Sequence, residues 1–527
     1  MHIRQNQPEA AMIRLAELMG ALSLATDLGM GQPLEFALRS CVLAVRLGEA
    51  LGMNDGELRE VYYQALLRYI GCNAETHMLA AILGDELVAR TNFVTVDTGR
   101  QSEMIGFVVR TIRETHAGAS PLQLARLFAR GLLSAPRVNE GFAGHCEVAQ
   151  RLAERLGFDQ RIIWALGQLY ERWDGRGLPN GLKGESIAPA VRVVTLAQDA
   201  VTFERLGSVE AAVAVAQERK GATYDPSMVE LFCRQAPQLL AGLEDEPSWD
   251  AVLALEPGAR TLLTDAQFDV ACRAMADFAD LKSTYMLGHS SGVAELAAGA
   301  AGRCGLPADD VAAIRRAGLL HDIGRVGVST GIWDKPGPLS DREWEQVRMH
   351  PYYTERVLAR PGALARLGTL AAYHHERLDG SGYHRGAPAA ILSPAARILA
   401  AADAYHAMTE PRPHRPARGR DAAAEQLRRE ARAGRLDSEA VSGVLAAAGH
   451  PASTARRQLV GGLSEREIEV LRLVARGNSM KQVAQLLTIS EKTVDNHIQH
   501  IYNKIGVSTR AGATLFALEQ DLLSDAS

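Results

Sequence analysis

The chain has 527 residues, of which 47% are hydrophobic and 23% are charged, so it holds enough apolar material for several cores. Its formal net charge of −5 excludes a uniformly basic surface for nucleic acid but leaves room for a local one. None of the six cysteines forms a C-x-x-C pair, which favours free thiols in a reducing compartment. Neither a signal peptide nor a run of about 18 apolar residues is present, so we expect a cytoplasmic protein that does not bind membranes.

Most of the sequence has the periodicity of amphipathic helices. The stretches "EFALRSCVLAVRLGEALGM" (35–53) and "HSSGVAELAAGAAGRCGL" (289–306) place apolar residues at i, i+3, i+4 and i+7. Stretches in which apolar and polar residues alternate are scarce. We therefore predict an all-α fold.

An internal repeat organises the chain. The segment "ERWDGRGLPNGLKG" from Glu171 matches "ERLDGSGYHRGAPA" from Glu376 at an offset of 205, and "ALLRYIGC" matches "GLLHDIGR" at an offset of 253. The first copy therefore holds 48 extra residues, which could form a lid or a separate helical contact. We predict two tandem helical units at 33–245 and 266–447, preceded by an N-terminal segment (1–32) and joined by an acidic linker (246–265).

Histidine and aspartate side chains gather in the second copy: His289, His321, Asp322, His350, His374, His375 and Asp403. A single histidine of this kind is usually a core or surface residue, but two adjacent pairs beside glycine-marked turns indicate a metal site. Imidazole and carboxylate ligands without thiolate suit iron or manganese better than structural zinc. Seven candidate ligands exceed the needs of one tetrahedral ion, so we expect two divalent metal ions that share a carboxylate.

The segments "LLHDIGR", "HHERLDGSGYH" and "ADAYHAMTEPRPHR" resemble, in order and spacing, the HD-GYP family of cyclic-di-GMP phosphodiesterases. The resemblance implies that the seven residues above are metal ligands, that Asp322 bridges the metals, and that Asp322 and Arg325 are catalytic. It also implies six substrate-binding residues: Arg325, Gly380, Gly382, Tyr383, Arg412 and Arg415. His384 departs from the signature proline, Arg325 replaces a lysine, and Tyr285 stands where some members add a glutamate for a third metal.

The first copy has lost nearly all of these ligands. Phe36 aligns with His289, Arg68-Tyr69 with His321-Asp322, and Leu169-Tyr170 with His374-His375, whereas His145 still aligns with His350. Gln198 aligns with Asp403, although a one-residue gap would align the neighbouring Asp199 instead. One or two ligands cannot hold a dinuclear centre, so we expect this copy to be free of metal. It is then either a structural or dimerising scaffold or a pocket for a regulatory ligand.

A third unit is expected at 461–527, after a linker at 448–460. Ser464 and Glu467 form a capping box, and Val494, Ile498 and Ile501 recur on one side of a later helix. The other side carries the residues that we predict to contact DNA: Lys492, Thr493, Asn496, His497, His500 and Lys504. The unit resembles the LuxR-type helix-turn-helix domain, which implies operator binding as a homodimer.

The two resemblances together predict a transcriptional regulator that hydrolyses cyclic-di-GMP and binds promoter DNA. Two alternatives remain at this point. The HD-GYP-like unit could be an inactive ligand-sensing or dimerising part of a transcription factor, or it could be a phosphohydrolase that acts on another nucleotide.

Overall fold

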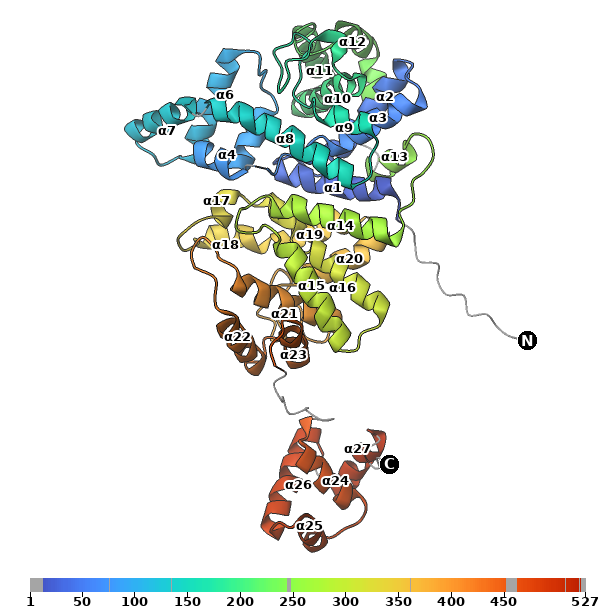
Figure 1. Cartoon of the computed structure of the whole chain (residues 1–527), viewed down its shortest axis with the longest axis vertical. Coiled ribbons are helices and arrows are strands. Elements are labelled where there is room, and N and C mark those ends of the chain that lie inside the picture. The colour runs from blue at the N-terminus through green and yellow to red at the C-terminus, as the bar shows by residue number, and fades with distance from the viewer. Residues whose placement is uncertain are drawn as a thin grey trace, which may run out of the picture. The chain divides into compact units, whose positions relative to one another are not determined.

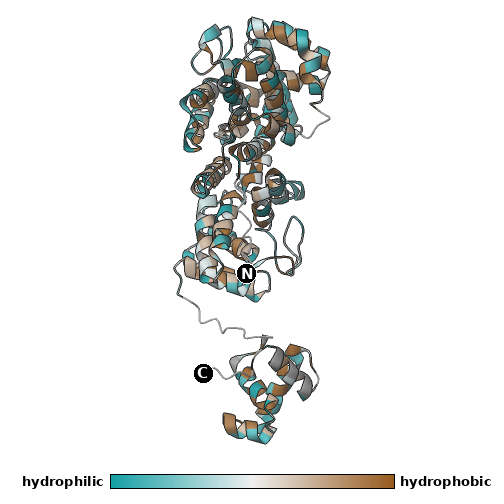
Figure 2. Cartoon of the chain, turned by 90° about the vertical axis from the view of Figure 1, so that its right-hand side faces the viewer, coloured by the Kyte–Doolittle hydropathy of each residue, from teal (hydrophilic) through white to brown (hydrophobic). Residues whose placement is uncertain are grey.

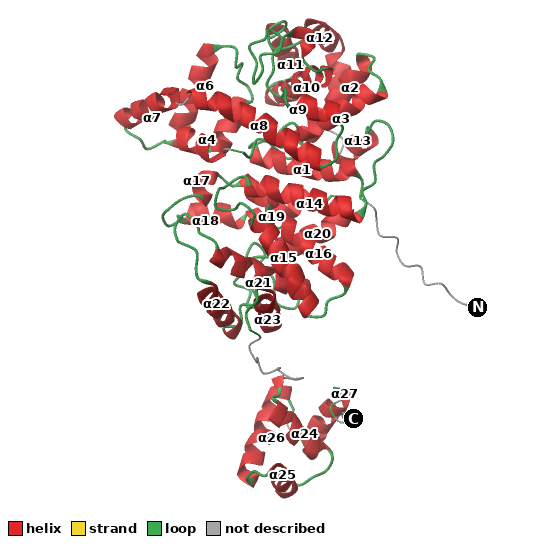
Figure 3. Cartoon of the chain, viewed as in Figure 1, coloured by secondary structure: helices red, strands yellow, loops and turns green. Residues whose placement is uncertain are grey.

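The computed structural model describes residues 13–520 and 522, except for 75, 134, 244–247, 361, 452–461 and 508. All named elements within these residues are helices (Figure 3), so the predicted all-α fold is confirmed. The chain divides into two compact units, 1–450 and 451–527. Most of the predicted linker at 448–460 lies outside the described residues.

The first copy occupies one half of the larger unit (Figure 1). Its central helices α2, α3 and α10 pack against one another, and α1 lies beside α2 and α3. The elements are α1 (Leu15–Gly29), α2 (Phe36–Ala50), α3 (Asp55–Leu67), α4 (Thr76–Leu83), α5 (Glu86–Phe93), α6 (Gln101–Thr115), α7 (Pro121–Leu133), α8 (Ala135–Arg155), α9 (Gln160–Leu166), the 3-10 helix η1 (Gly184–Ser186), α10 (Pro189–Leu206), α11 (Val209–Glu218), α12 (Pro226–Leu240) and α13 (Ser248–Ala254).

The second copy forms the other half of this unit. Its helix α15 packs against α16, α21 and α23. The elements are α14 (Asp265–Asp280), α15 (His289–Arg303), α16 (Ala308–Leu320), the 3-10 helix η2 (Ile323–Gly327), α17 (Thr330–Trp333), α18 (Asp341–Arg348), α19 (His350–Leu358), α20 (Gly362–Ala372), α21 (Pro394–Thr409), α22 (Arg420–Arg432) and α23 (Ser438–Ala447).

The two copies share local geometry as well as sequence. A Cβ atom on Gly71 would lie 1.9 Å from the carbonyl oxygen of His145, and one on Gly324 would lie 2.2 Å from that of His350. Only glycine fits at either position, because two backbone segments touch there. In each copy, a buried glutamate, Glu171 or Glu376, also accepts hydrogen bonds from the main-chain N–H groups nine and eleven residues later.

The predicted N-terminal segment and linker both contain helices that join the core. Helix α1 is buried on nearly all sides, and Gly20 within it lies against Trp249 of α13, where an added Cβ would approach the indole to 2.8 Å. The main-chain N–H of Leu15 donates to the carbonyl of Thr261 at 2.8 Å. One hydrophobic core consequently runs through both copies.

A buried ion pair connects the copies. The Nζ atom of Lys282, after α14, lies 2.8 Å from the Glu86 carboxylate at the start of α5, and both side chains are at most 2% exposed. The same carboxylate accepts from the Thr330 N–H at 2.8 Å and from the Ser329 hydroxyl at 3.1 Å. The helices of the first copy's extra residues are thus fixed to the loop that follows η2.

The smaller unit contains α24 (Glu465–Ala475), α25 (Met480–Leu487), α26 (Glu491–Ile505) and α27 (Arg510–Glu519). The capping box of Ser464 and Glu467 begins α24 as predicted, and Ser490 caps α26. Its own core includes Val494 and Ile501, the inward positions of α26.

Hydrophobic and hydrophilic residues mix along most helices of the chain (Figure 2). Among the described residues, no helix is both long and apolar enough to cross a membrane.

Replacing Lys282 by Met should leave the Glu86 carboxylate buried without its counter-charge and lower the free energy of unfolding by about 3–5 kcal/mol. A neutral Gln at position 86 needs no counter-charge when it is buried. The double variant Glu86→Gln with Lys282→Met should therefore recover most of the stability that Lys282→Met loses. Urea denaturation of the full chain measures both changes. As a control, Lys335→Met removes the partly exposed Lys335–Glu343 pair and should change stability far less than Lys282→Met does. A double variant as unstable as Lys282→Met would contradict this account.

Candidate metal centre and nucleic-acid interface

Five elements bring the predicted metal ligands together. His289 begins α15, His321 follows the last residue of α16, and His350 begins α19. The pair His374-His375 lies in the turn after α20, and Asp403 lies within α21. Four of the imidazoles are buried, and the side chain of His375 is 21% exposed. The structure therefore gathers all seven residues, which are spread over more than a hundred positions of sequence, around one point.

Main-chain carbonyls aim three of the imidazoles. The Nδ1 atoms of His321, His350 and His374 lie 2.7, 2.6 and 2.7 Å from the carbonyl oxygens three residues earlier. A carbonyl can only accept, so Nδ1 carries the proton in each ring and Nε2 keeps its lone pair. Fixing the tautomer through the second nitrogen is what metal-binding histidines typically require.

The Asp322 carboxylate lies between two groups of histidines. Its Oδ1 atom is 3.4 Å from Nε2 of His350 and 3.6 Å from Nε2 of His374. Its Oδ2 atom is 3.5 Å from Nε2 of His321 and 3.8 Å from Nε2 of His289. Each oxygen therefore faces a different histidine pair.

The ligand chemistry fits divalent metal. Nε2 of His321 and Oδ1 of Asp322 are buried and have no hydrogen-bond partner. Such atoms are costly to bury unless something binds them. Both atoms belong to residues of one compact group of potential ligands, His289-His321-Asp322. A second such group, His350-His374-His375, faces the Asp322 carboxylate. This region is therefore a candidate metal centre.

Burial and neighbouring charge set the protonation states. Burial lowers the pKa of His321 to about 4 and also lowers that of His350, so both rings are neutral near pH 7. Burial acts in the same direction on His289, but its hydrogen bonds to Asp403 and Glu410 outweigh it and raise the pKa to about 9. Burial raises the pKa of Asp322, yet the Arg325 guanidinium and the imidazoles hold it well below its usual range.

Glu410 and His406 are additional polar neighbours that sequence reasoning missed. The Glu410 carboxylate lies 2.7 Å from Nδ1 of His289, and His406 lies 3.3 Å from the same nitrogen. A carboxylate on the outer nitrogen of a metal-binding imidazole orients the ring and raises its basicity. Glu410 directly follows the last residue of α21, and no spacing in the sequence pointed to its contact with His289, which lies 121 residues away.

The predicted substrate contacts divide into two kinds. The Arg325 guanidinium lies 3.6 Å above the Trp333 ring and 3.3 Å from Oδ2 of Asp322, and the Tyr383 ring packs at 4.7 Å on His375. Arg412 reaches Glu410 at 3.0 Å, so these three side chains border the centre. The guanidinium of Arg415 instead donates to the carbonyls of Ala407 and Glu410 at the end of α21, which ties it to the main chain.

The glycine-rich loop after α20 keeps a tight shape although His384 replaces proline. Gly380 has a φ of +76°, and a Cβ on Gly382 would lie 2.4 Å from Cα of Glu376, so both positions require glycine. The Tyr383–His384 peptide bond is cis, as is the aligned Leu178–Pro179 bond of the first copy. The loop leads the Tyr383 side chain to the metal-centre histidines.

The aligned region of the first copy has a different chemistry. His145 uses both ring nitrogens, with Nδ1 3.3 Å from the Tyr170 hydroxyl and Nε2 3.1 Å from the Ala74 carbonyl. Arg68, Tyr69 and Gln198 lie nearby around a cavity. Among the described residues, the groups of side chains that could hold a metal ion all belong to the second copy.

Helix α26 presents the predicted DNA contacts unevenly. Lys492, Asn496 and His500 are exposed, whereas Thr493 and His497 are half-buried. Lys504 forms an ion pair within the unit, because its Nζ lies 2.7 and 2.8 Å from the two carboxylate oxygens of Glu467 in α24. The free polar side of α26 therefore consists mainly of its first three turns.

Two family models match the chain. One described as "HD domain" matches residues 121–228 and 273–440, which fall in the two copies, and one described as "Bacterial regulatory proteins, luxR family" matches residues 462–517.

Relatives and solved structures agree with these matches. The 3′3′-cGAMP-specific phosphodiesterase 3 of Vibrio cholerae is 33% identical over 76% of this chain and 88% of its own length. A cyclic di-GMP phosphodiesterase of Pseudomonas aeruginosa is 40% identical over 28% of this chain and 34% of its own. The crystal structure of a cyclic GMP-AMP-specific phosphodiesterase from V. cholerae has a TM-score of 0.58 and 28% identity, and covers 83% of this chain and 98% of that one. The chain therefore belongs to the HD-GYP family of HD-domain phosphodiesterases and carries a domain of the LuxR family.

Proposed function

We propose that the second copy hydrolyses a 3′,3′-cyclic dinucleotide with two divalent metal ions, iron or manganese, and that the LuxR-type unit binds promoter DNA in the cytoplasm. The observation that carries the enzymatic part is the Asp322 carboxylate, whose two oxygens face separate histidine pairs at 3.4–3.8 Å.

The arrangement supports a bridged pair of ions better than a single one. His289 and His321, with Asp403, would hold one ion, and His350, His374 and His375 would hold the other, with Asp322 between them. When bound, such ions would activate water for attack at phosphorus and neutralise charge on the phosphoryl oxygens. Buried imidazoles with fixed tautomers would hold this geometry rigid.

The substrate groups suit a phosphodiester. The Arg325 guanidinium, which lies over the Trp333 ring, would offer forked hydrogen bonds to a phosphoryl oxygen beside Asp322. Arg412 would supply a second positive charge, and the Gly380–Gly382 turn would let the backbone approach the nucleotide. Arg415 would act indirectly by holding the end of α21.

Two cyclic dinucleotides are candidates. Cyclic-di-GMP is the substrate implied by the sequence motifs. The relative that matches 76% of this chain is named a 3′3′-cGAMP-specific phosphodiesterase, which favours 3′3′-cGAMP. A direct comparison of kcat/KM for the two compounds decides between them.

The His350→Gln variant should lose metal and activity, because Gln cannot replace an imidazole that faces Asp322. We expect about two metal ions per chain in the wild type and fewer in the variant. Hydrolysis should fall by at least about 100-fold, since loss of mere outer partners of metal ligands already costs about 10–100-fold. Elemental analysis by mass spectrometry and chromatography of the linear product measure both quantities.

The first copy supplies the matched control. His145→Gln changes the aligned histidine, and it should alter neither metal content nor hydrolysis. Loss of metal from both variants to the same extent would contradict the assignment to the second copy. Metal-free wild type without turnover would favour a non-enzymatic regulator.

For DNA binding, Asn496→Ala should weaken affinity for an operator selected in vitro by about 1–3 kcal/mol, since a paired base contact is worth that much. Fluorescence anisotropy at fixed salt measures the affinity. Lys504→Met provides the contrast. Because this variant loses the contact with Glu467, it should lower the melting temperature of the unit and leave its preference between DNA sequences largely unchanged. An Asn496→Ala variant with wild-type affinity and specificity would show that α26 does not read the bases.

Operator binding is the readout for coupling between the units. If enzyme state controls the regulator, the affinity of the full chain for its operator should change when the cyclic dinucleotide or the metal is removed. An operator affinity that stays the same under all these conditions would show that DNA binding is not coupled to the enzyme.

A further inference from the structure

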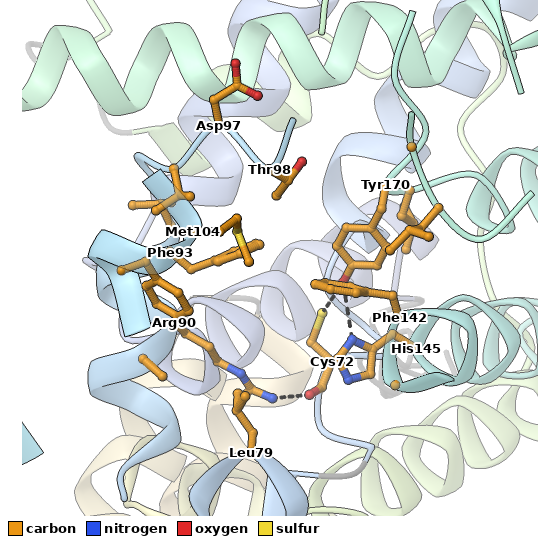
Figure 4. A pocket seen from close by; sticks show the side chains of 18 of the residues that line it. Cys72, Leu79, Arg90, Phe93, Asp97, Thr98, Met104, Phe142, His145 and Tyr170 are labelled. Carbon is orange, nitrogen blue, oxygen red and sulfur yellow. Dashed lines mark hydrogen bonds between the residues drawn. The ribbon is translucent and has the colours of Figure 1, made fainter. Parts of the chain in front are cut away.

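The first copy encloses a cavity of about 580 Å³ in the region that aligns with the metal centre. Helices α4 to α7, which carry most of the extra residues, form one wall with their own small hydrophobic core. Figure 4 shows Phe93, Met104 and Phe142 around this space, with Cys72 and His145 joined through the Tyr170 hydroxyl. A cavity of this size falls in the range of sites for small organic ligands.

One end of the cavity is polar and unsatisfied. Arg68 is only 9% exposed, and its Nη1 atom is buried without a hydrogen-bond partner. Oε1 of Gln198 and Oγ1 of Thr195 also line the cavity and are buried without partners. Buried polar atoms are rarely left unsatisfied in native proteins, so the unpaired Arg68 Nη1 and the Thr195 hydroxyl, which can both donate, indicate a missing acceptor group of a ligand, whereas Oε1 of Gln198 can only accept.

Three other buried arginines of the wall already have partners. The Arg90 guanidinium donates to the carbonyls of Gly29 and Cys72. Arg172 pairs with Asp97 at 2.5 Å, and Arg219 pairs with Asp199 at 3.3 Å. Among the four buried arginines of the wall, Arg68 is therefore the one with a buried donor left unpaired.

The remaining wall is apolar. It includes Leu79, Ile82, Phe107, Val108 and Phe128 as well as the rings shown in Figure 4. Nucleobases and sugars would leave their polar groups unpaired against these side chains, which is unfavourable. An alkyl chain or a small aromatic system would fit this part of the cavity.

We propose that the first copy is a binding site for an amphipathic monoanion, in which the Arg68 guanidinium and the Thr195 hydroxyl donate to the acidic group and the apolar wall of α4 to α7 surrounds the body. The polar end occupies the positions that align with the metal ligands of the second copy, since Arg68 replaces His321 and Gln198 replaces Asp403. The guanidinium thus supplies the positive charge that metal ions would supply in the other copy. This inference does not depend on the proposed hydrolysis.

The test uses the full chain with decanoate as the probe, in the presence of a chelator so that the metal centre cannot contribute. Titration calorimetry should show one decanoate bound per chain, with decylammonium bound at least tenfold more weakly. Arg68→Met should weaken decanoate binding about tenfold or more, because a charge-assisted hydrogen bond is lost. The control Arg151→Met changes a side chain that is 73% exposed, and should leave binding unchanged.

A second variant guards against misfolding of the first. Val108→Trp fills the apolar part and should abolish decanoate binding while Arg68 is kept. Circular dichroism establishes that each variant is folded. The proposal is overturned if decanoate does not bind, if neither variant weakens its binding, if decylammonium binds equally well, or if the cavity takes a cyclic dinucleotide in place of decanoate.

Discussion

A buried carboxylate surrounded by imidazoles is the interaction on which the second copy depends. Asp322 can remain ionised in the core only because Arg325 and the rings of four buried histidines face it. Three of those rings, His321, His350 and His374, keep their lone pairs inward because carbonyls of the preceding turns hold the outer nitrogens, whereas the outer nitrogen of His289 contacts the Glu410 carboxylate. Helices α15, α16, α19 and α21 must therefore converge there, and Gly324 lets the backbone at His350 come close enough.

The same scaffold serves a different chemistry in the first copy. Gly71 and Glu171 preserve the close backbone contact and the glutamate-held loop, so the architecture survives the loss of the ligands. An arginine and a glutamine now stand in place of a histidine and an aspartate, and the extra helices enclose a cavity beside them. The buried Glu86–Lys282 pair ties these helices to the loop after η2, which adjoins Arg325.

Sequence reasoning could propose the candidate metal ligands and the α26 pattern because short sequence motifs carry them. His321-Asp322, for example, are neighbours in the chain, and Ser490 caps α26 from the adjacent residue. The contact of Glu410 with His289 spans 121 residues and belongs to no repeat, so only the packing of α21 against α15 reveals it. Likewise, the hydrogen bonds of Arg415 to main-chain carbonyls depend on where α21 ends. The cavity beside Arg68 depends on which helices the extra residues form.

The central claim is that metal chemistry resides in the second copy alone. Anomalous X-ray diffraction from crystals of the full chain reconstituted with manganese or iron tests it most directly, because the anomalous signal places each ion without reference to activity. The account predicts two neighbouring peaks on either side of the Asp322 carboxylate and none beside His145 or Arg68. A single peak at Asp322 would contradict the dinuclear centre, and a peak in the first copy would contradict the division of roles between the copies.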